Sequence, residues 1–394
     1  MRKTMLSLLV LLFSINAYSV EFEEDGISYN YIPDQELSVS VANNGCKYFG
    51  DVVIPARVEH DGVTYTVRGI DYQAFFKCTD LSSVKIPATV SNFNEGYTFS
   101  QCTSLTRIEL PSNLTAVPNG MCWGCTSLKS ISLPESITSI GEYAFATCSS
   151  LSDISLPSSV ESIGKAAFMG TAIENFVLPE KVTTLEPYVL ALTTKLTNIT
   201  LHDKLTSIGE CAFQGNTVLK TVALPEGLQS IEASAFASCP SLQDITIPDG
   251  ITSIPDKCFY NDMALGRIVI GKGVATIGSD CFARYKNNTA SPELKDVYLL
   301  ADGIVSGGDS FLDAACQGAT LHVVKSLVEA YRAQPGWNRF NIVAIQDGEL
   351  SAISSAKAET ANGGLRPYSI DGTAQNRHTR GIVIAGGKKF VNMK

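Results

Sequence analysis

The chain has 394 residues, a formal net charge of −9 and only 18% charged residues, against roughly 25% in average globular proteins. Nucleic acids and anionic membranes attract basic surfaces, so this acidic balance argues against both as partners. After residue 19 no apolar stretch approaches the roughly 20 residues that a membrane-spanning helix needs. The composition therefore favours a protein without a membrane span.

The first 19 residues have the composition of an export signal. Arg2 and Lys3 precede the apolar run 6–13, and the small residues Ala17 and Ser19 follow it. This order predicts a secretory signal peptide over 1–19. The run is too short for a membrane anchor, so we expect a protein that is secreted or held at the outer cell surface after cleavage.

Residues 20–67 predict an N-terminal β cap. Apolar and polar residues alternate over 27–32 and 63–67, which is typical of half-buried strands, and His60, Asp61 and Gly62 favour a turn. Repeat proteins need such ends, because the first repeat otherwise leaves its edge open.

Residues 68–300 consist of a phrase that recurs about every 23 residues. Each copy has a Leu-x-x-Ile-x-Leu segment, a proline and then Ile-Gly-x-x-Ala-Phe-x-x-Cys. The Phe position, called here the Phe column, holds Phe75, Phe99, Cys122, Phe145, Phe168, Leu190, Phe213, Phe236, Phe259 and Phe282. A fixed period predicts a β-rich solenoid of about nine to ten repeats, in which each unit buries its apolar residues against copies of itself.

Within each repeat, the first segment predicts a short strand that ends at the proline, which cannot donate to a sheet. The second segment is too short for a regular helix and predicts turns. The last copy is lengthened by 286–292, which predicts a loop.

Most of the 11 cysteines follow the same period. Cys78, Cys102, Cys125, Cys148 and Cys239 lie three residues after the Phe column, and Asn216 occupies the same place in another copy. Buried cysteine behaves as a small apolar residue, so we expect a column of unpaired, buried thiols. Cys46 lies outside this register, and its pairing stays open.

Chemical motifs are scarce. Cys122 and Cys125 have the CxxC spacing of thiol oxidoreductases, but they fall on repeat positions without the βαβ context of those enzymes. The 4 histidines show no metal-ligand spacing. We therefore expect no catalytic residues, no metal and no cofactor.

The end of the chain changes character twice. Residues 301–346 predict a C-terminal cap, 347–366 an Ala-, Ser- and Gly-rich linker, and 367–394 a separate tail. The tail has an Asp-Gly pair at 371–372, a Gly-Ile-Val-Ile run from Gly381 and a Gly-Lys-Lys run that ends at Lys389.

The repeat phrase, intact from Leu133 to Leu151, resembles the BspA-type leucine-rich repeats of bacterial surface proteins. Residues 319–342 resemble the C-terminal cap of Bacteroides-type members, in which Trp337 and Phe340 would shield the last repeat. The tail resembles the end of type IX secretion domains, which implies a turn at the Asp-Gly pair and two strands in the runs at 381–384 and 387–389. The resemblance implies a surface protein that binds other molecules.

The strand register also predicts a binding face. The residues beside each central apolar residue should point outward, onto the concave surface that solenoids use for binding. These candidate residues are Arg107, Glu109, Ser130, Ser132, Asp153, Ser155, Asn175, Asn198, Thr200, Thr221, Asp244, Thr246 and Arg267. The face is polar, and none of these positions is aromatic.

The leading hypothesis, which rests on the resemblance, is adhesin-like binding of host or bacterial proteins, extracellular matrix included. The alternative is an envelope protein that captures carbohydrate or acts as a scaffold. Because sugars bind preferably on aromatic side chains, a face without aromatics disfavours carbohydrate. The ligand and the oligomeric state stay open.

Overall fold

The computed structural model describes residues 20–94, 96–283, 294–311, 313–346 and 349, and the backbone of 381–385 and 388–392. The chain divides into two compact units, 1–155 and 156–394, which we describe separately. The expected signal peptide at 1–19, the expected loop at 286–292 and nearly all of the expected linker lie outside the described residues.

Unit 1 begins with a sheet that leads into the repeats. Its strands are β1 (Phe22–Glu24), β2 (Ile27–Tyr31), β3 (Ser38–Val41), β5 (Arg57–His60), β6 (Val63–Ile70) and β8 (Asn92–Phe93). β1, β2 and β3 pair antiparallel in turn, whereas β3 and β8 pair with β6 in parallel. Tyr29, Val39 and Val67 form its fully buried centre. The region expected as a cap therefore already contributes parallel strands to the first coil.

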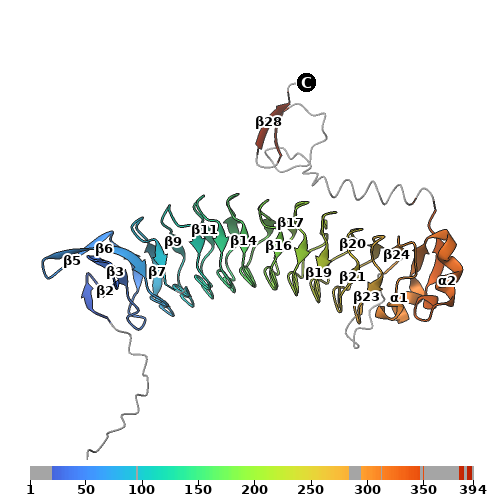
Figure 1. Cartoon of the computed structure of the whole chain (residues 1–394), viewed down its shortest axis with the longest axis horizontal. Helices are drawn as coiled ribbons and strands as arrows, with labels where there is room; N and C mark the ends of the chain where they lie inside the picture. Colours follow the sequence, from blue (N-terminus) through green and yellow to red (C-terminus); the bar gives the residue numbers. More distant parts are fainter. Residues whose placement is uncertain are drawn as a thin grey trace, which may run out of the picture. The chain divides into compact units, whose positions relative to one another are not determined.

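The coils of unit 1 follow this sheet (Figure 1). Their first strands are β4 (Gly50–Val53), β7 (Leu81–Lys85), β9 (Arg107–Glu109), β11 (Ser130–Ser132) and β13 (Asp153–Ser155). β4, β7 and β9 form one parallel sheet, and β11 pairs with β13 in parallel. Val84, Ile108 and Ile131 at their centres are buried. The solenoid predicted from the repeat is confirmed.

Most coils of the repeat region also have a second, two-residue strand, which the sequence pattern did not predict. In unit 1 these are β10 (Ala116–Val117) and β12 (Ser139–Ile140), which pair in parallel. Val117 and Ile140 point into the core. The Ile of the Ile-Gly pair is therefore a strand residue that satisfies its backbone against the next coil.

The segment around the Phe column forms what we call the turn side of each coil. In the coil of Phe99, the residues two before and two after it, Tyr97 and Gln101, have positive φ angles of 52° and 65°. The N–H groups of Tyr97, Phe99 and Gln101 all donate to carbonyls of the next coil, at 2.7, 2.8 and 2.6 Å. The second segment of the repeat is too short for a regular helix, and it adopts this turn conformation instead.

Unit 2 continues with the same kind of coil. Its strands are β14 (Ser162–Ile163), β15 (Asn175–Val177), β16 (Thr184–Leu185), β17 (Asn198–Thr200), β18 (Ser207–Ile208), β19 (Ser230–Ile231), β20 (Asp244–Ile247), β21 (Ser253–Ile254), β22 (Arg267–Ile270), β23 (Thr276–Ile277), β24 (Asp296–Leu299), β25 (Thr320–Val323) and β26 (Asn341–Ala344). β15 pairs with β17, β18 joins β16 to β19, and β21 pairs with β23.

The last four members of the Phe column form a continuous stack in unit 2. Phe213, Phe236, Phe259 and Phe282 lie face to face, with centroids 5.0, 5.4 and 5.4 Å apart. Phe311 extends the stack at 4.7 Å from Phe282. Burial of one ring per coil contributes roughly 1.5–3 kcal/mol in transfer free energy.

The region 301–346, expected as a cap, prolongs the solenoid. β20, β22, β24, β25 and β26 form one parallel five-stranded sheet. Between its strands lie η1 (Gly308–Ser310), α1 (Asp313–Gly318), η2 (Lys325–Leu327), α2 (Val328–Ala333) and η3 (Trp337–Arg339). Trp337 is only 2% exposed and its Nε1 donates to the Val305 carbonyl at 2.8 Å. Trp337 and Phe340 pack on Phe311, and in this aromatic stack it is Phe311 that contacts Phe282 of the last repeat, in place of the pair expected from the resemblance.

The tail contains a hairpin of β27 (Gly381–Ala385) and β28 (Lys388–Asn392), which pair antiparallel. Both strands were expected from the sequence. Whether they act in sorting stays a prediction.

Candidate functional site

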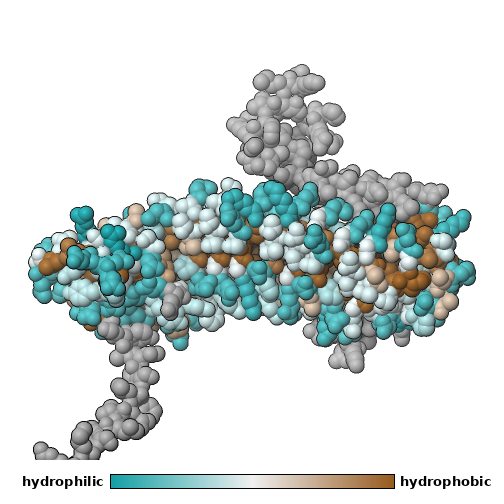
Figure 2. Space-filling model, viewed as in Figure 1, coloured by the Kyte–Doolittle hydropathy of each residue, from teal (hydrophilic) through white to brown (hydrophobic). Residues whose placement is uncertain are grey.

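The candidate site is the exposed surface of the first strands, which we call the strand face of each unit. On it the side chains before and after each buried central residue point outward. Every candidate residue of the sequence analysis is exposed or half-buried, in agreement with the predicted register. Figure 2 shows hydrophilic side chains over most of the visible surface, with hydrophobic residues in narrow strips between them.

In unit 1 the parallel ladder places equivalent residues of successive coils side by side. Ser83 faces Arg107 and Lys85 faces Glu109 in the β7–β9 pair. Glu109 forms ion pairs with both cations. Its Oε1 lies 2.6 Å from Arg107 Nη2, and its Oε2 lies 3.4 Å from Lys85 Nζ. Exposed ion pairs contribute about 0–1 kcal/mol to the stability of the fold. This cluster therefore matters more for the charge of the surface than for folding.

The next pair of strands in unit 1 carries small polar side chains. Ser130 lies beside Asp153 and Ser132 beside Ser155, and all four are exposed. Their backbone groups are fixed in the ladder, so the surface is flat, polar and rigid.

In unit 2 the strand face carries an amide pair. Asn198 Nδ2 donates to Asn175 Oδ1 at 2.8 Å, and beside them Thr200 lies next to Val177, which is 65% exposed. Further along, Thr221 bridges to Asp244 and Asp244 lies beside Arg267. The unit therefore offers hydrogen-bonding groups with one exposed apolar side chain among them.

The C-terminal end of the unit 2 strand face differs from the expectation. Register continues from Val269 to Tyr298 on β24 and His322 on β25, so this face does contain an aromatic residue. Val269, expected to point outward into solvent, is buried with Tyr298 and Leu300 beneath Ile345. The sequence pattern missed this because the covering residue follows β26 in the segment assigned to the cap.

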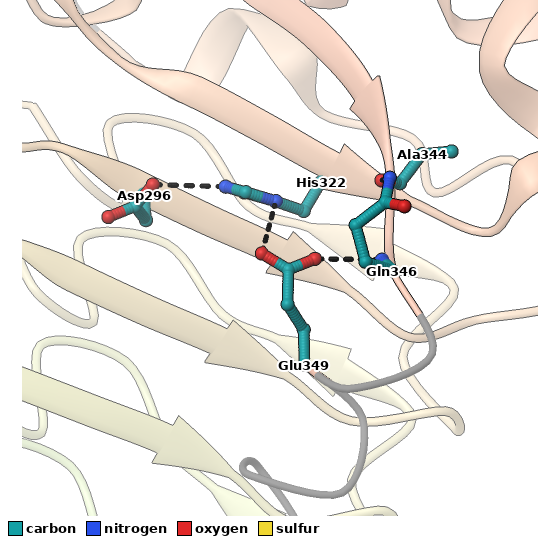
Figure 3. A network of polar contacts seen from close by, with 5 residues as sticks. All are labelled: Asp296, His322, Ala344, Gln346 and Glu349. Carbon is teal, nitrogen blue, oxygen red and sulfur yellow. Dashed lines mark hydrogen bonds and ion pairs between the residues drawn. The ribbon is translucent and has the colours of Figure 1, made fainter.

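A polar network closes this end (Figure 3). His322 Nε2 lies 3.0 Å from Asp296 Oδ1, and its Nδ1 lies 3.6 Å from Glu349 Oε1. The His322 ring stacks on Tyr298 at 4.1 Å, with the Arg267 guanidinium 5.3 Å above Tyr298. Arg267 is thus held by the ring below it and is only half-exposed.

The cysteines of the predicted column lie inside, as expected. We call the positions three residues after the Phe column the inner polar column. Four thiols in it donate to the Phe-column carbonyl one coil earlier: Cys102 to Phe75 at 2.9 Å, Cys125 to Phe99 at 3.0 Å, Cys148 to Cys122 at 3.0 Å and Cys239 to Phe213 at 3.2 Å. Thr193 donates in the same way to Phe168 at 3.2 Å.

Burial suppresses the reactivity of these thiols. It raises the pKa of Cys78 to about 12, and that of Cys125 and Cys148 well above the ordinary value. The thiolate is the nucleophile, so Cys122 and Cys125, both fully buried, are packing residues despite their CxxC spacing. Cys46 is exposed, and its Sγ donates to the Phe76 carbonyl at 2.9 Å.

The histidines have structural partners. His60 Nδ1 lies 2.8 Å from Glu24 Oε1, and the ring of His202 reaches the Pro179 carbonyl at 2.9 Å. His378 lies outside the described residues. Among the residues that the structure describes, no three His, Cys, Asp or Glu side chains gather to hold a metal, and no helix has the length and hydropathy to cross a membrane.

Comparison with protein families identifies the repeats. Six copies of the BspA type leucine rich repeat region match residues 68–197 and 186–294, which together span more than half of the chain. The chain belongs to the BspA-type leucine-rich repeat family. A search of curated proteins found no match.

Among solved structures, the chain is similar to a leucine rich repeat protein of T. pallidum, with 28% identity over 55% of this chain and 87% of the other, at a TM-score of 0.42. It is 21% identical to a leucine-rich repeat protein from Bacteroides ovatus, over 83% of this chain and 100% of the other, at a TM-score of 0.41. A leucine rich cell surface protein from Faecalibacterium prausnitzii is 20% identical, over 84% of this chain and 97% of the other, at a TM-score of 0.44.

Proposed function

We propose that this BspA-type chain is an exported, adhesin-like protein that binds host or bacterial proteins on its strand face. The observation that carries the proposal is the parallel register. It places exposed polar residues of successive coils side by side, as for Ser130 with Asp153 and Asn175 with Asn198.

Such a face suits a broad protein contact. The strand backbone is already ordered, so binding costs little conformational entropy beyond the side chains. Short Ser, Thr and Asn side chains lose less rotamer freedom than long ones, and each adds hydrogen-bonding groups to the interface. Contact of this kind is spread over many residues rather than concentrated in a few deep pockets.

The strand face fits carbohydrate less well. None of the candidate residues is aromatic, and the rings that continue their register, Tyr298 and His322, are 9% and 8% exposed and stack on each other. A sugar ring therefore finds no open aromatic surface among the described positions of this face.

Export is the second part of the proposal. The basic, apolar and small-residue order of 1–19 supports cleavage after Ser19, and the β27–β28 hairpin supports a sorting role for 367–394. Intact-mass analysis of the protein from its native culture tests this. We expect a mature chain that begins at Val20, and a chain that retains 1–19 contradicts the proposal.

Binding to a panel of purified matrix and bacterial surface proteins tests the first part. Replacing Ser130 and Ser132 together with Arg adds two long cations to the unit 1 strand face, whereas Ser149→Arg adds one to an exposed position of the same unit outside that face. We expect saturable binding of at least one protein, a loss of at least tenfold in the double variant and unchanged affinity in Ser149→Arg. No saturable binding, or equal losses in both variants, contradicts the assignment.

A further inference from the structure

A row of exposed aromatic side chains lies on the turn side of unit 1. Tyr72, Tyr97 and Trp123 each belong to a different one of three successive coils, and we call them the aromatic row. Tyr72 is 44% and Trp123 38% exposed, while Tyr97 between them is half-buried. Large aromatic side chains are usually covered in soluble proteins, so three in a row indicate a binding surface.

The rings contact one another in sequence. The centroids of Tyr72 and Tyr97 are 6.2 Å apart with planes at 79°, and those of Tyr97 and Trp123 are 6.2 Å apart at 71°. Edge-to-face contacts of this kind hold aromatic rings in defined orientations. The row is therefore preformed, and a ligand that lies along it meets one ring per coil.

The backbone of the turn side fixes the row. The N–H of Tyr97 donates to the Asn119 carbonyl at 2.7 Å, and the Trp123 carbonyl accepts from Gln101 N at 2.6 Å. The ring of Tyr97 lies over Gly120, where a Cβ would collide with it. Because Gly120 has no side chain, the Tyr97 ring can occupy this space.

Tyr97 also has an unfavourable backbone conformation for a bulky residue. Its φ is 52°, and the equivalent residue of the next coil is Gly120, at 56°. Glycine adopts this region freely, whereas a residue with a Cβ does not. The same position also has a positive φ in other coils, as at Gln73 and Tyr143, so this backbone conformation belongs to the repeat, and in this coil it sets where the Tyr97 ring lies.

The flanks of the row are polar. Half-buried Gln101 and exposed Asn119 and Glu142 lie on the same turn segments. Burial raises the pKa of Tyr97 above its ordinary value, so its hydroxyl stays a hydrogen-bond donor. Rings with amides and hydroxyls at their edges match a pyranose, which presents C–H groups on one face and hydroxyls around its rim.

We propose that the aromatic row binds a neutral polysaccharide, whose sugar rings stack on Tyr72 and Trp123 and whose hydroxyls bond to Tyr97 and Gln101. The row is narrow and lacks the closed apolar pocket that anchors protein hot spots. The exposed Glu142 carboxylate and the net charge of −9 oppose an acidic glycan. This site lies on the turn side, so it is separate from the strand face.

Tryptophan fluorescence reads this site directly. The chain has 2 tryptophans, and only Trp123 is open to an aqueous quencher because Trp337 is 2% exposed. Soluble β-glucan, mannan and xylan are added separately to the full chain, and iodide quenching is measured. We expect at least one of them to reduce the quenching at least twofold, with no change in Trp123→Phe, whose remaining fluorescence comes from Trp337.

Affinity electrophoresis in gels that contain the same polysaccharides gives the second readout. We expect Tyr72→Ala and Trp123→Ala to weaken the retardation at least tenfold, and Phe49→Ala, which removes another exposed ring of unit 1, to leave it unchanged. The strand-face variant with Arg at 130 and 132 should also keep it. Wild-type chain that none of the three polysaccharides protects or retards overturns the proposal, as does equal retardation of wild type and Trp123→Ala. The proposal is also overturned if the wild type binds no polysaccharide and Tyr72→Ala loses binding to a protein partner. That result would assign the row to protein contact.

Discussion

The inner polar column and the strand face both place small polar residues in successive coils, yet they have opposite surroundings. In the column, the thiols of Cys102 and Cys125 are buried and donate to carbonyls of the preceding coil. On the strand face, Ser130 and Ser132 point into solvent. Packing therefore fixes the type of residue at a buried position of the repeat, whereas an exposed position can hold different residues.

The largest difference should come from the apolar stack next to the column. Phe236 lies between Phe213 and Phe259 and is fully buried. Phe236→Ala should cost about 3–5 kcal/mol, because it leaves a cavity between two rings. Urea unfolding followed by circular dichroism measures this, and a cost below about 1 kcal/mol would place Phe236 outside the core.

The second test uses the raised pKa values of the buried thiols. Cys125, Cys148 and Cys239 stay protonated in the folded chain at pH values where the unfolded chain, with thiol pKa values of about 8.5, releases protons. Stability is therefore fully present below about pH 8.5 and should fall as the pH rises above it. Urea midpoints between pH 7 and pH 10 measure the slope, and Cys148→Ser should reduce it. A midpoint that does not change with pH contradicts the account.

A smaller effect is expected at Asn216. Its side chain is 0% exposed, and neither its amide nitrogen nor its oxygen has a hydrogen-bond partner. The matching residues Thr193 and Cys239 each donate to a carbonyl. Because an unsatisfied buried polar group costs about 1–3 kcal/mol, Asn216→Cys should stabilise unit 2 by about 1 kcal/mol or more. Destabilisation by this change would show that Asn216 has a role that the column does not explain.

The smallest effect on stability is expected outside. Replacing Ser130 and Ser132 with Ala removes two exposed hydroxyls and should change the unfolding free energy by less than about 0.5 kcal/mol. The urea midpoint of this variant is the measurement. A loss comparable with that of Phe236→Ala would mean that the strand face carries structure rather than binding.

Much of this could be predicted from the sequence because the period determines which residues share an environment. Phe75, Phe99 and Cys102 lie where the repeat places them, and Arg107 faces solvent beside Ser83. Because successive side chains of a strand point to opposite faces, the position of one buried Ile is enough to predict which neighbours point outward.

The rest depends on contacts that break the period. Ile345 covers Val269 and Tyr298 from the segment that follows β26, and no repeat position marks it. The aromatic row was not predicted from the sequence either, since Tyr72 and Trp123 occupy different positions relative to Phe75 and Cys122. The Tyr97 ring lies between them and contacts both, and no shared repeat position predicts these contacts.

Site-specific cross-linking tests the central claim, that partners bind on the strand face. A photoreactive residue replaces Asn198 on the unit 2 strand face, and in a matched control it replaces Lys195, which is exposed three residues earlier outside the strand. Both proteins are irradiated with the purified matrix or surface protein that binds saturably. We predict a cross-link from position 198 and none from position 195. A cross-link from 195 alone would contradict the assignment of the strand face.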